Sequence, residues 1–399
     1  MKKVSFIHCA DLHLDSPITG LRNVPNFIVK RLQESTFSSF SAIIDKAIAY
    51  KVDFIIIAGD IFDGEDRSIK AQIRFRKEME RLHAHHIAAY IIHGNHDHLK
   101  GSWTKIVFPD NVYVFPVEVT AKTYKKENTT VELYGFSYEA RHIMERKIAD
   151  YKRKETGDYH IGILHGNLEG SSGHSPYAPF SMQELTAKQM DYWALGHIHK
   201  RAILADEPLI VYPGNIQGRH KKETGEKGGY FVQLNEIDTK IEFFSTATIV
   251  WKNIIFDATG IQTLDELMLL VNQKVEGERK AGRSFILFLE IHQLMITDSI
   301  DEMELLEILQ QEPVEEEEFI WVASIKYKEN KRWIKDHLVN ESEFYKELFA
   351  AANNLQNVEK ALDPLYGHPA AHRYLSELTD EEKKELAVEA ENILIKLLN

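Results

Sequence analysis

The sequence predicts an α/β fold built on a partly parallel sheet that is covered on both faces. Apolar runs typical of buried strands recur through the first half of the chain, and helical patterns near residues 25–50 and 67–86 separate the first three runs. Apolar strands that alternate with helices indicate such a sheet, and its ligands gather at the carboxyl ends of the strands. The strand-like runs are 4–8, 53–59, 88–94, 160–166 and 209–214.

Beyond residue 100 the pattern changes. Alternating, β-rich segments at 111–119 and 130–136 predict a second sheet packed on the first. From about residue 256 a separate α+β unit is expected, with strands near 254–257, 285–291 and 319–327 and helices near 263–275 and 300–310. The tail from about residue 341 is expected to be helical. The predicted domains are therefore 1–255, 256–340 and 341–399.

The last helix of the tail has a marked start and an apolar stripe. Thr379 and Glu382 form a capping box that predicts where this helix begins. The residues that follow on one helical face are Leu386, Ala390, Ile393, Leu394 and Leu397. Such a stripe is expected to be buried, and docking on the chain's own body or on a partner both remain open.

The charge of the chain is unevenly distributed. The formal net charge of -13 by itself disfavours nucleic-acid binding, since phosphate contacts are normally built from clustered Lys and Arg. However, residues 1–256 carry 33 Lys and Arg against 31 Asp and Glu, whereas residues 257–399 carry 15 against 30. The acidity belongs to the last third, and metal-bound carboxylates would leave the first part more positive still. DNA therefore remains a candidate partner.

Length and cysteine content limit the class of protein. A chain of 399 residues exceeds what one hydrophobic core usually supports, so more than one domain is expected. Cys9 is the single cysteine, which excludes an internal disulfide framework and fits a reducing compartment. The first residues turn polar too early for a signal peptide, and no stretch approaches the length of a membrane span. A soluble cytoplasmic protein is expected, with no membrane partner.

Seven potential metal ligands lie in five short clusters near strand ends. They are Asp11, His13, Asp60, Asn95, His165, His197 and His199. Two divalent ions about 3.5–4 Å apart are a common device for hydrolysing phosphate esters. Asp60 is the natural bridging carboxylate of such a pair. Because carboxylate, imidazole and carboxamide ligands occur here without thiolate, Mn²⁺ is the expected metal, and iron or zinc would also fit.

Five motifs resemble the signature of calcineurin-like metallophosphoesterases. They are Asp11-Leu12-His13, Gly59-Asp60-Ile61-Phe62-Asp63, Gly94-Asn95-His96-Asp97, His165-Gly166 and Gly196-His197-Ile198-His199. The opening FIHCADLHLDSP and the stretch YPGNIQGRHKKETGEKGGYFVQL further resemble the DNA-repair exonuclease branch, the SbcD nucleases, and especially their YhaO-type relatives. The resemblance covers about residues 1–250. It implies a metallophosphoesterase double β-sandwich flanked by helices, followed by a small capping domain.

The resemblance also implies a role for each motif residue. One ion would be held by Asp11, His13, Asp60 and His199, and the other by Asp60, Asn95, His165 and His197. His96 would face the phosphate, where it stabilises the transition state or protonates the leaving oxygen, and Asp63 would orient it. Asp15 and Ser16 stand where many SbcD proteins have a glycine, which leaves the DNA substrate open.

The implied function is a two-metal-dependent DNA nuclease that acts in DNA repair with an SbcC-like coiled-coil ATPase. The helical tail is the expected docking element for that ATPase, and related nucleases are often homodimers. Two alternatives stay open. One is a phosphodiesterase or phosphatase that acts on nucleotides or phosphoproteins, and the other is a non-catalytic scaffold of an ATPase complex. The intact ligand set argues against the scaffold.

Two further segments are candidates for contact with substrate. Arg219, His220, Lys221 and Lys222 form a basic cluster after a strand end, where a loop could hold the DNA backbone. A solvated loop without a partner fits the same residues. Residues 171–177 follow His165 and could gate the site, although their Gly, Ser and Pro content is also typical of any surface loop.

Overall fold

The computed structural model describes residues 2–64, 68–100, 104, 106–170, 177–279, 282–294, 301–310, 318–328, 335, 338–366 and 378–398. The strands of its first half are β1 (Lys3–Cys9), β2 (Phe54–Ala58), β3 (Ala88–Ile92), β4 (Val112–Val114), β5 (Thr120–Lys126), β6 (Thr129–Gly135), β7 (Tyr159–His165) and β8 (Tyr192–Gly196). They are followed by β9 (Ala202–Asp206), β10 (Leu209–Tyr212), β11 (Gly228–Asn235) and β12 (Thr239–Ser245). The helices of this region are α1 (Asn26–Tyr50), α2 (Ile69–Ala84), the short 3-10 helix η1 (Lys147–Asp150) and α3 (Met182–Ala187).

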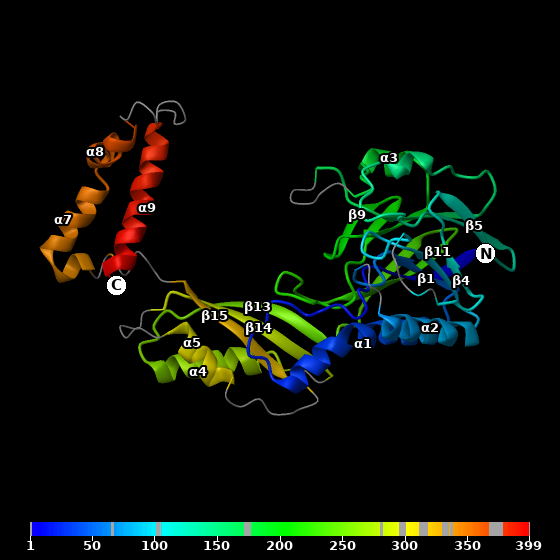
Figure 1. Cartoon of the computed structure of the whole chain (residues 1–399), viewed down its shortest axis with the longest axis horizontal. Helices are drawn as coiled ribbons and strands as arrows, with labels where there is room; N and C mark the ends of the chain where they lie inside the picture. Colours follow the sequence, from blue (N-terminus) through cyan, green and yellow to red (C-terminus); the bar gives the residue numbers. More distant parts are fainter. Residues whose placement is uncertain are drawn as a thin grey trace. The chain divides into compact units, whose positions relative to one another are not determined.

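Two six-stranded sheets form the body of this region (Figure 1). The first has the order β12-β11-β1-β2-β3-β4, and its strands β1 to β4 are parallel. The second has the order β5-β6-β7-β8-β10-β9, and its strands β6, β7, β8 and β10 are parallel. The predicted α/β class, the partly parallel sheet and the second sheet are thereby confirmed.

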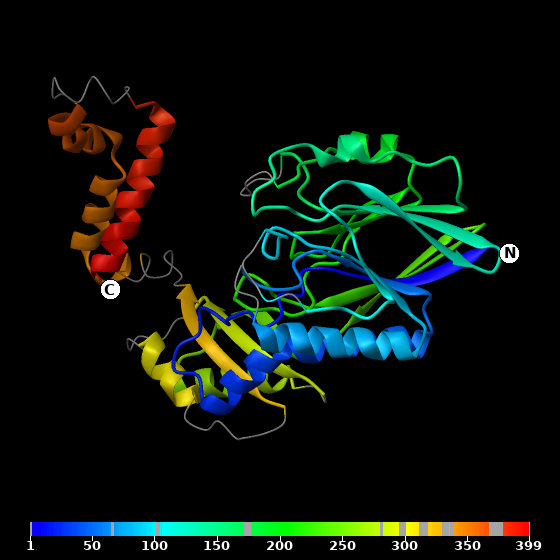
Figure 2. The same cartoon turned by 45° about the vertical axis from the view of Figure 1, so that its right-hand side comes forward.

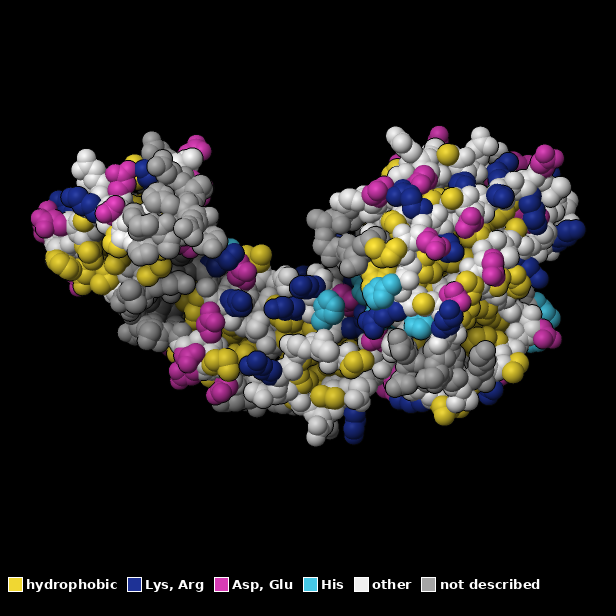
Figure 3. All heavy atoms as spheres, turned by 45° about the horizontal axis from the view of Figure 1, so that its top comes forward, with side chains coloured by type: hydrophobic (Ala, Val, Ile, Leu, Met, Phe, Trp, Pro, Cys, Tyr) yellow, Lys and Arg dark blue, Asp and Glu magenta, His cyan; other side chains and the backbone are white. Residues whose placement is uncertain are grey.

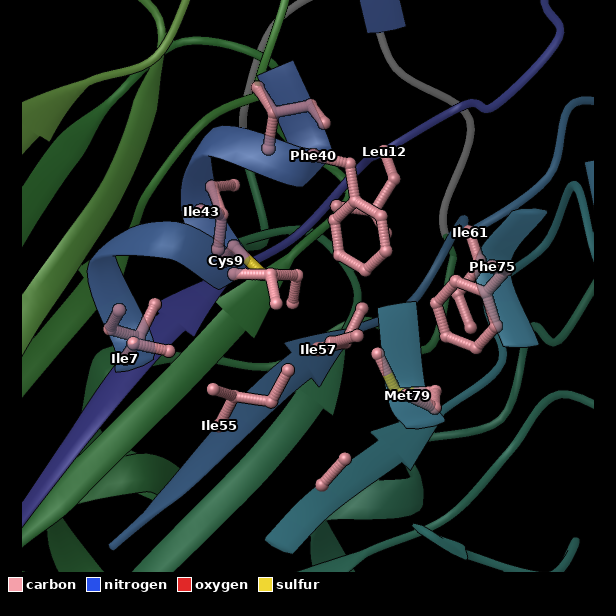
Figure 4. Close-up of a cluster of buried hydrophobic side chains, with 14 of the residues drawn as sticks. Ile7, Cys9, Leu12, Phe40, Ile43, Ile55, Ile57, Ile61, Phe75 and Met79 are labelled. Atoms are coloured by element: carbon pink, nitrogen blue, oxygen red, sulfur yellow. The ribbon is translucent and has the colours of Figure 1, made fainter. Parts of the chain in front are cut away.

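Side-chain alternation along the strands separates the layers. On β2, Ile55 and Ile57 belong to the core shared with α1 and α2, which Figure 4 shows in close-up. Phe54 and Ile56 point the other way, into the core between the two sheets. A third core, which includes Leu185 of α3, covers the outer face of the second sheet. Figure 2 shows the resulting order of layers, with helices outside both sheets.

Most predicted strands have boundaries close to those observed, but β8, β9, β11 and β12 were not among the predicted runs. The run 209–214 is β10, and the run 160–166 is β7. The strand that leads into His197 is β8, with the sequence YWALG, which was not among the predicted runs. Strand β8 lies between β7 and β10, so the His197 cluster joins the other clusters at the centre of the second sheet.

The remaining elements are a three-stranded sheet and a set of helices. The sheet has the order β13 (Ile249–Asp257), β14 (Ser284–His292) and β15 (Ile320–Lys328). The helices are α4 (Leu264–Glu276), α5 (Glu302–Gln310), α7 (Glu343–Ala352), α8 (Leu355–Tyr366) and α9 (Asp380–Leu398). By its internal contacts the chain divides into two compact units: Met1–Asn253 with Val275–Phe288 and Leu309–Ala323, and Ile254–Lys274 with Leu289–Ile308 and Ser324–Asn399. In the described residues no helix is both long and apolar enough to cross a membrane.

The start of α9 has the predicted capping box. Thr379 Oγ1 accepts a hydrogen bond from the Glu382 backbone at 3.3 Å, and the Glu382 carboxylate accepts one from the Thr379 backbone at 2.8 Å. The residues of the apolar stripe on α9 lie in two different places. Leu394 packs against the cluster of Leu338 and Phe349, while Leu386, Ala390 and Ile393 line a groove with residues of α7 and α8. The side chain of Leu397 lies outside what the structure describes.

One buried histidine joins the two large sheets. His8 on β1 donates from Nε2 to the carbonyl of Leu195 at 3.2 Å, so its Nδ1 accepts from the Tyr192 hydroxyl at 3.0 Å. Burial lowers the pKa of His8 to about 3. In the unfolded chain a histidine has a pKa of about 6.5. Between these two values only the unfolded state takes up the proton, so acid destabilises the fold.

We therefore expect the His8→Gln variant to lose less stability in acid than the wild type. The glutamine amide can keep both hydrogen bonds but does not titrate. Between pH 6.5 and pH 5, the free energy of unfolding of the metal-free wild type should fall by about 1–2 kcal/mol more than that of the variant. Urea denaturation at pH 7, 6 and 5 measures the difference. Equal pH slopes would mean that folded His8 is readily protonated.

Candidate metal centre

The candidate ligands converge at the carboxyl ends of five parallel strands in two sheets. Asp11 and His13 follow β1, Asp60 follows β2 and Asn95 follows β3. His165 ends β7, and His197 and His199 follow β8. Backbone hydrogen bonds fix the first two loops to each other, from Asp11 N to Gly59 O at 3.1 Å and from His13 N to Asp60 O at 3.0 Å. All seven side chains thus reach one edge of the two-sheet body.

Several ligand positions have an unusual backbone. Asp11, His13, Asp60 and His197 have φ values of 52, 43, 50 and 98 degrees. Residues other than glycine rarely adopt positive φ, and it costs about 1–3 kcal/mol at each position. Such strain is typical of functional sites, and here the turn out of each strand directs a polar side chain toward the shared edge.

Two glycines leave room for the packed imidazoles and carboxylates. A Cβ on Gly59, whose φ is +92, would lie 2.3 Å from His165 Nδ1. A Cβ on Gly94 would lie 2.3 Å from Asp60 Oδ1. Neither position can therefore accept a larger side chain without displacing a candidate ligand.

The first group of donors consists of Asp11, His13 and His199. One ligand atom from each lies within 4.8 Å of the others. The Nε2 atoms of His13 and His199 are 3.1 Å apart. The Asp11 carboxylate accepts two hydrogen bonds from the backbone N–H of His197, at 3.0 and 3.1 Å, and these hold it in place.

The second group consists of Asp60, His165 and His197, again with ligand atoms within 4.8 Å of one another. Asn95 joins this group, because its Oδ1 lies 3.0 Å from His165 Nε2 and 3.1 Å from His197 Nδ1. Asp60 Oδ2 lies 3.4 Å from His165 Nε2 and 3.8 Å from His13 Nε2. Asp60 thus faces both groups, as a bridging carboxylate must.

The ring nitrogens of His13 and His199 that face each other are unprotonated, which fits a cation bound between them. His199 Nδ1 donates to Glu223 at 2.6 Å, and His13 Nδ1 faces Asp63 at 3.3 Å, so the Nε2 atoms of both rings carry lone pairs. Burial, together with Arg219, lowers the pKa of His13 to about 4, which keeps its ring neutral at pH 7. Two lone pairs that face each other repel. A cation held by both nitrogens would offset this repulsion.

The hydrogen bonds and pKa of His165 indicate that the second group of donors also fits a cation. Its Nδ1 donates to the carbonyl of Ala58 at 2.9 Å, while its Nε2 faces oxygen atoms of Asp60 and Asn95. Burial by itself lowers the pKa of His165, but the carboxylates of Asp60 and Asp11 and the carbonyl of Ala58 together outweigh burial and raise it to about 9. The ring therefore holds a proton at the place where a divalent ion would replace it. The donor set fits two hard or borderline metal ions.

His96 and Asp63 lie beside the donors. His96 Nδ1 is 3.1 Å from Asp63 Oδ1, and Asp63 Oδ2 accepts from the Ser16 hydroxyl at 2.7 Å. The contact with Asp63 raises the pKa of His96. Burial would raise the pKa of Asp63, but its hydrogen bonds to His13 and His96 hold it far below the usual range. The His96 side chain is 33% exposed, so its outer edge is accessible to a substrate.

An open pocket of about 590 Å³ adjoins the donors. Its lining residues are Asp60, His96, His197, Ile198, His199, Lys200, His220, Lys222, Glu223, Thr224 and Lys227. Five of these carry nitrogen bases or cations outside the candidate ligand set. Figure 3 shows histidine side chains beside lysine and arginine side chains on the visible face. The pocket therefore joins a candidate metal site to a basic wall, which suits an anionic substrate.

The four residues of the basic cluster, Arg219 to Lys222, differ in burial and in whether they line the pocket. Arg219 is buried, where its guanidinium contacts Glu223 and Ser16 and faces away from solvent. His220 lines the pocket, whereas Lys221 is exposed and is not among the lining residues. Lys222 also lines the pocket. Of the predicted gating segment, residues 171–176 lie outside the described residues, and the ring of Tyr177 lies 4.9 Å from that of His197.

Two site residues were missed by the sequence interpretation. Glu223 is 4% exposed and contacts His199, and Lys227 is 7% exposed and donates to the carbonyl of His199 at 2.8 Å. Burial lowers the pKa of Lys227 to about 8. Both lie in a stretch rich in Lys, Glu and Gly, which is typical of a solvated loop. No local pattern distinguishes them, because their burial depends on distant strands.

Comparisons with known proteins agree with this geometry. The family description "Calcineurin-like phosphoesterase" matches residues 4–201. The metallophosphoesterase YhaO of Bacillus subtilis is 40% identical over 98% of this chain and 97% of its own length. The DNA double-strand break repair protein Mre11 of Methanocaldococcus jannaschii is 26% identical over 59% of this chain and 64% of its own length. The protein of the same name from Sulfurisphaera tokodaii is 29% identical over 56% of this chain and 59% of its own length.

Proposed function

Because the chain belongs to the calcineurin-like phosphoesterase family, whose members are metal-dependent phosphoester hydrolases, we propose that it is a two-metal DNA nuclease that acts in DNA repair. The observation that carries the proposal is that seven side chains with oxygen and nitrogen donors, Asp60 among them, lie together beside a pocket with a basic wall. The likeness to Mre11 proteins, named for DNA double-strand break repair, supports DNA as the substrate.

The two ions are proposed to share Asp60. Asp11, His13 and His199 would complete one ion, and Asn95, His165 and His197 would complete the other. Bound divalent ions would neutralise phosphate charge and make water a stronger nucleophile at neutral pH. We propose Mn²⁺ as the metal, because carboxylate and carboxamide oxygens accompany the imidazoles and thiolate is absent from the seven.

The chain's own residues would bind and protonate the substrate. Asp63 holds Nδ1 of His96, so the Nε2 side of the ring can direct a proton to the leaving oxygen of a phosphodiester. His220 and Lys222 on the pocket wall would contact neighbouring phosphates. A pocket that is open to solvent suits a polymeric substrate better than a closed cavity for a mononucleotide would.

The C-terminal helices are the proposed contact for an SbcC-like coiled-coil ATPase. Their groove is lined mainly by small and apolar side chains: Ala351, Ala352, Val358, Ala361, Leu362, Leu386, Ala390 and Ile393, with Asn357 and Glu389. A groove of this kind is suited to an amphipathic helix, and the apolar residues of a coiled coil would fill it. We keep the division 1–255, 256–340 and 341–399 as the proposed nuclease, capping and docking parts, and the cytoplasm as the proposed compartment.

A nuclease assay with defined DNA ends tests the proposal. Purified protein in Mn²⁺ should release nucleotides or short fragments from linear duplex or single-stranded DNA, and a chelator should stop the reaction. Small phosphodiesters, nucleotides and a phosphopeptide serve as competing substrates in parallel. Faster turnover of a small substrate than of DNA would favour the phosphodiesterase or phosphatase alternative. Metal binding without hydrolysis of any substrate would favour the non-catalytic scaffold.

A further inference from the structure

A buried hydrogen-bond network adjoins the candidate ligands, and none of the three residues that form it is itself a candidate ligand. It is built from Glu223, Arg219 and Ser16, which come from two chain segments far apart in the sequence. Glu223 lies in a turn held by hydrogen bonds from Glu223 N to His220 O at 2.9 Å and from Gly225 N to Trp251 O at 2.8 Å. Its carboxylate is thereby fixed in the interior, where an unpaired charge would be strongly unfavourable.

Glu223 is the hydrogen-bond partner of His199. The distance from His199 Nδ1 to Glu223 Oε1 is 2.6 Å, in the range of a charge-assisted hydrogen bond. This contact fixes both the tautomer and the ring orientation of His199. It places the lone pair of Nε2 toward His13, where the first ion is proposed. Histidines that bind metals commonly donate their other N–H to a carboxylate in this way.

Arg219 links Glu223 to Asp63. Its backbone N–H donates to Glu223 Oε2 at 2.8 Å, and Nη2 lies 3.3 Å from Glu223 Oε1. On the other side, Nη1 donates to Ser16 Oγ at 2.9 Å and lies 3.6 Å from Asp63 Oδ2. Asp63 in turn contacts His13 and His96. One guanidinium therefore joins the carboxylates that orient three histidines of the site.

We propose that Glu223 and Arg219 are positioning residues. Glu223 would set the affinity of the ion held by Asp11, His13 and His199, and Arg219 would couple this ion site to His96 through Asp63. The inference rests on the proposed two-metal function. It adds that different residues hold the ligands of the two ion sites in place, because within the described residues Glu223 contacts His199 and no donor of the second group.

Mn²⁺ titration of the whole chain by calorimetry tests the role of Glu223. Glu223→Ala should weaken one of two Mn²⁺ sites by about 10–100-fold and leave the other near its wild-type affinity. Glu223→Gln should weaken the same site less, because its amide oxygen can still accept from His199 Nδ1. Glu226→Gln is the matched control, since Glu226 lies in the same loop but its carboxylate pairs with Arg283 and Ser245, and it should bind both ions as the wild type does.

Two readouts separate positioning from general loss of structure. The melting temperature of the metal-free variants shows whether they fold, and the visible spectrum with Co²⁺ as probe reports the ligand geometry of the weakened site. If Glu223→Gln folds and binds both ions with wild-type affinity, or if both sites weaken equally, the positioning role is overturned. If the wild type binds no Mn²⁺, the proposed function itself fails.

Arg219→Lys tests the coupling to His96. A lysine keeps the charge but cannot bridge two carboxylates with a planar fork of donors. We expect this variant to weaken the same Mn²⁺ site and to lower kcat on DNA by about tenfold or more, with little change in KM. Wild-type kcat at saturating Mn²⁺ in a folded Arg219→Lys protein would overturn the coupling while leaving the role of Glu223 standing.

Discussion

Replacing Asp60 by asparagine is expected to abolish hydrolysis and to remove the paired binding of two metal ions. Asp60 faces both donor groups, with Oδ2 at 3.4 Å from His165 Nε2 and 3.8 Å from His13 Nε2. An amide keeps the shape but loses the charge that lets one residue bridge two cations. Metal ions supply several kcal/mol of transition-state stabilisation, so the rate should fall by at least about 10³-fold.

Asparagine is the appropriate substitution because of the backbone. Asp60 has a φ of 50 degrees, and asparagine tolerates this region better than alanine does. Asp53→Asn is the matched control. Asp53 is a buried carboxylate just before β2 that contacts Ser5 and Lys126, outside the donor groups. This control should keep both metal ions. An Asp60→Asn protein that binds two Mn²⁺ ions as tightly as the wild type would refute the bridging role.

His96→Gln is expected to separate catalysis from metal binding. The His96 side chain points its outer edge at the pocket, and its backbone N–H donates to Asp60 Oδ1 at 2.9 Å independently of the side chain. Loss of a general acid or of a group that stabilises transition-state charge typically costs about 10²–10³-fold in kcat. Both Mn²⁺ ions should remain bound, because none of the seven proposed ligands is changed.

The His220→Gln variant is expected to affect substrate binding more than the catalytic rate, in contrast to His96→Gln. His220 lines the same pocket but lies on its basic wall, so its loss should raise KM for DNA more than it lowers kcat. Steady-state kinetics on a short duplex, with Mn²⁺ titrations of each variant, measure both effects. If kcat of His96→Gln equals that of the wild type while metal still binds, the proposed role of His96 is wrong.

The sequence predicted the framework of the site because that framework is local. Each apolar run fixes a strand, and the polar residue after it must lie at the carboxyl end of that strand. Asp11, Asp60 and Asn95 were placed in this way, and the structure brings them to one edge of the sheets. Strand β8 was not among the predicted runs, although YWALG is as long as β2 and β3 and is likewise an uninterrupted apolar run, so the sequence did carry a signal for it.

The residues that hold the candidate ligands in place could not be predicted from local patterns. The basic cluster that contains Arg219 was interpreted either as a contact for DNA or as a solvated loop, and the structure buries Arg219 between Glu223 and Ser16. Ser16 precedes α1, whereas Arg219 follows β10, so only the folded sheets bring them together. A charged residue that pairs with a distant charge has the same sequence appearance as one in solvent, and this limits any interpretation of basic clusters.

The most direct test of the two-metal account is the electron paramagnetic resonance spectrum of the wild-type chain titrated with Mn²⁺. Ions about 3.5–4 Å apart that share a carboxylate are magnetically coupled. We expect two ions per chain and the multiline spectrum of a coupled Mn²⁺ pair, which Asp60→Asn should lose. A spectrum of isolated Mn²⁺ ions at full occupancy, or a limit of one ion per chain, would contradict the account.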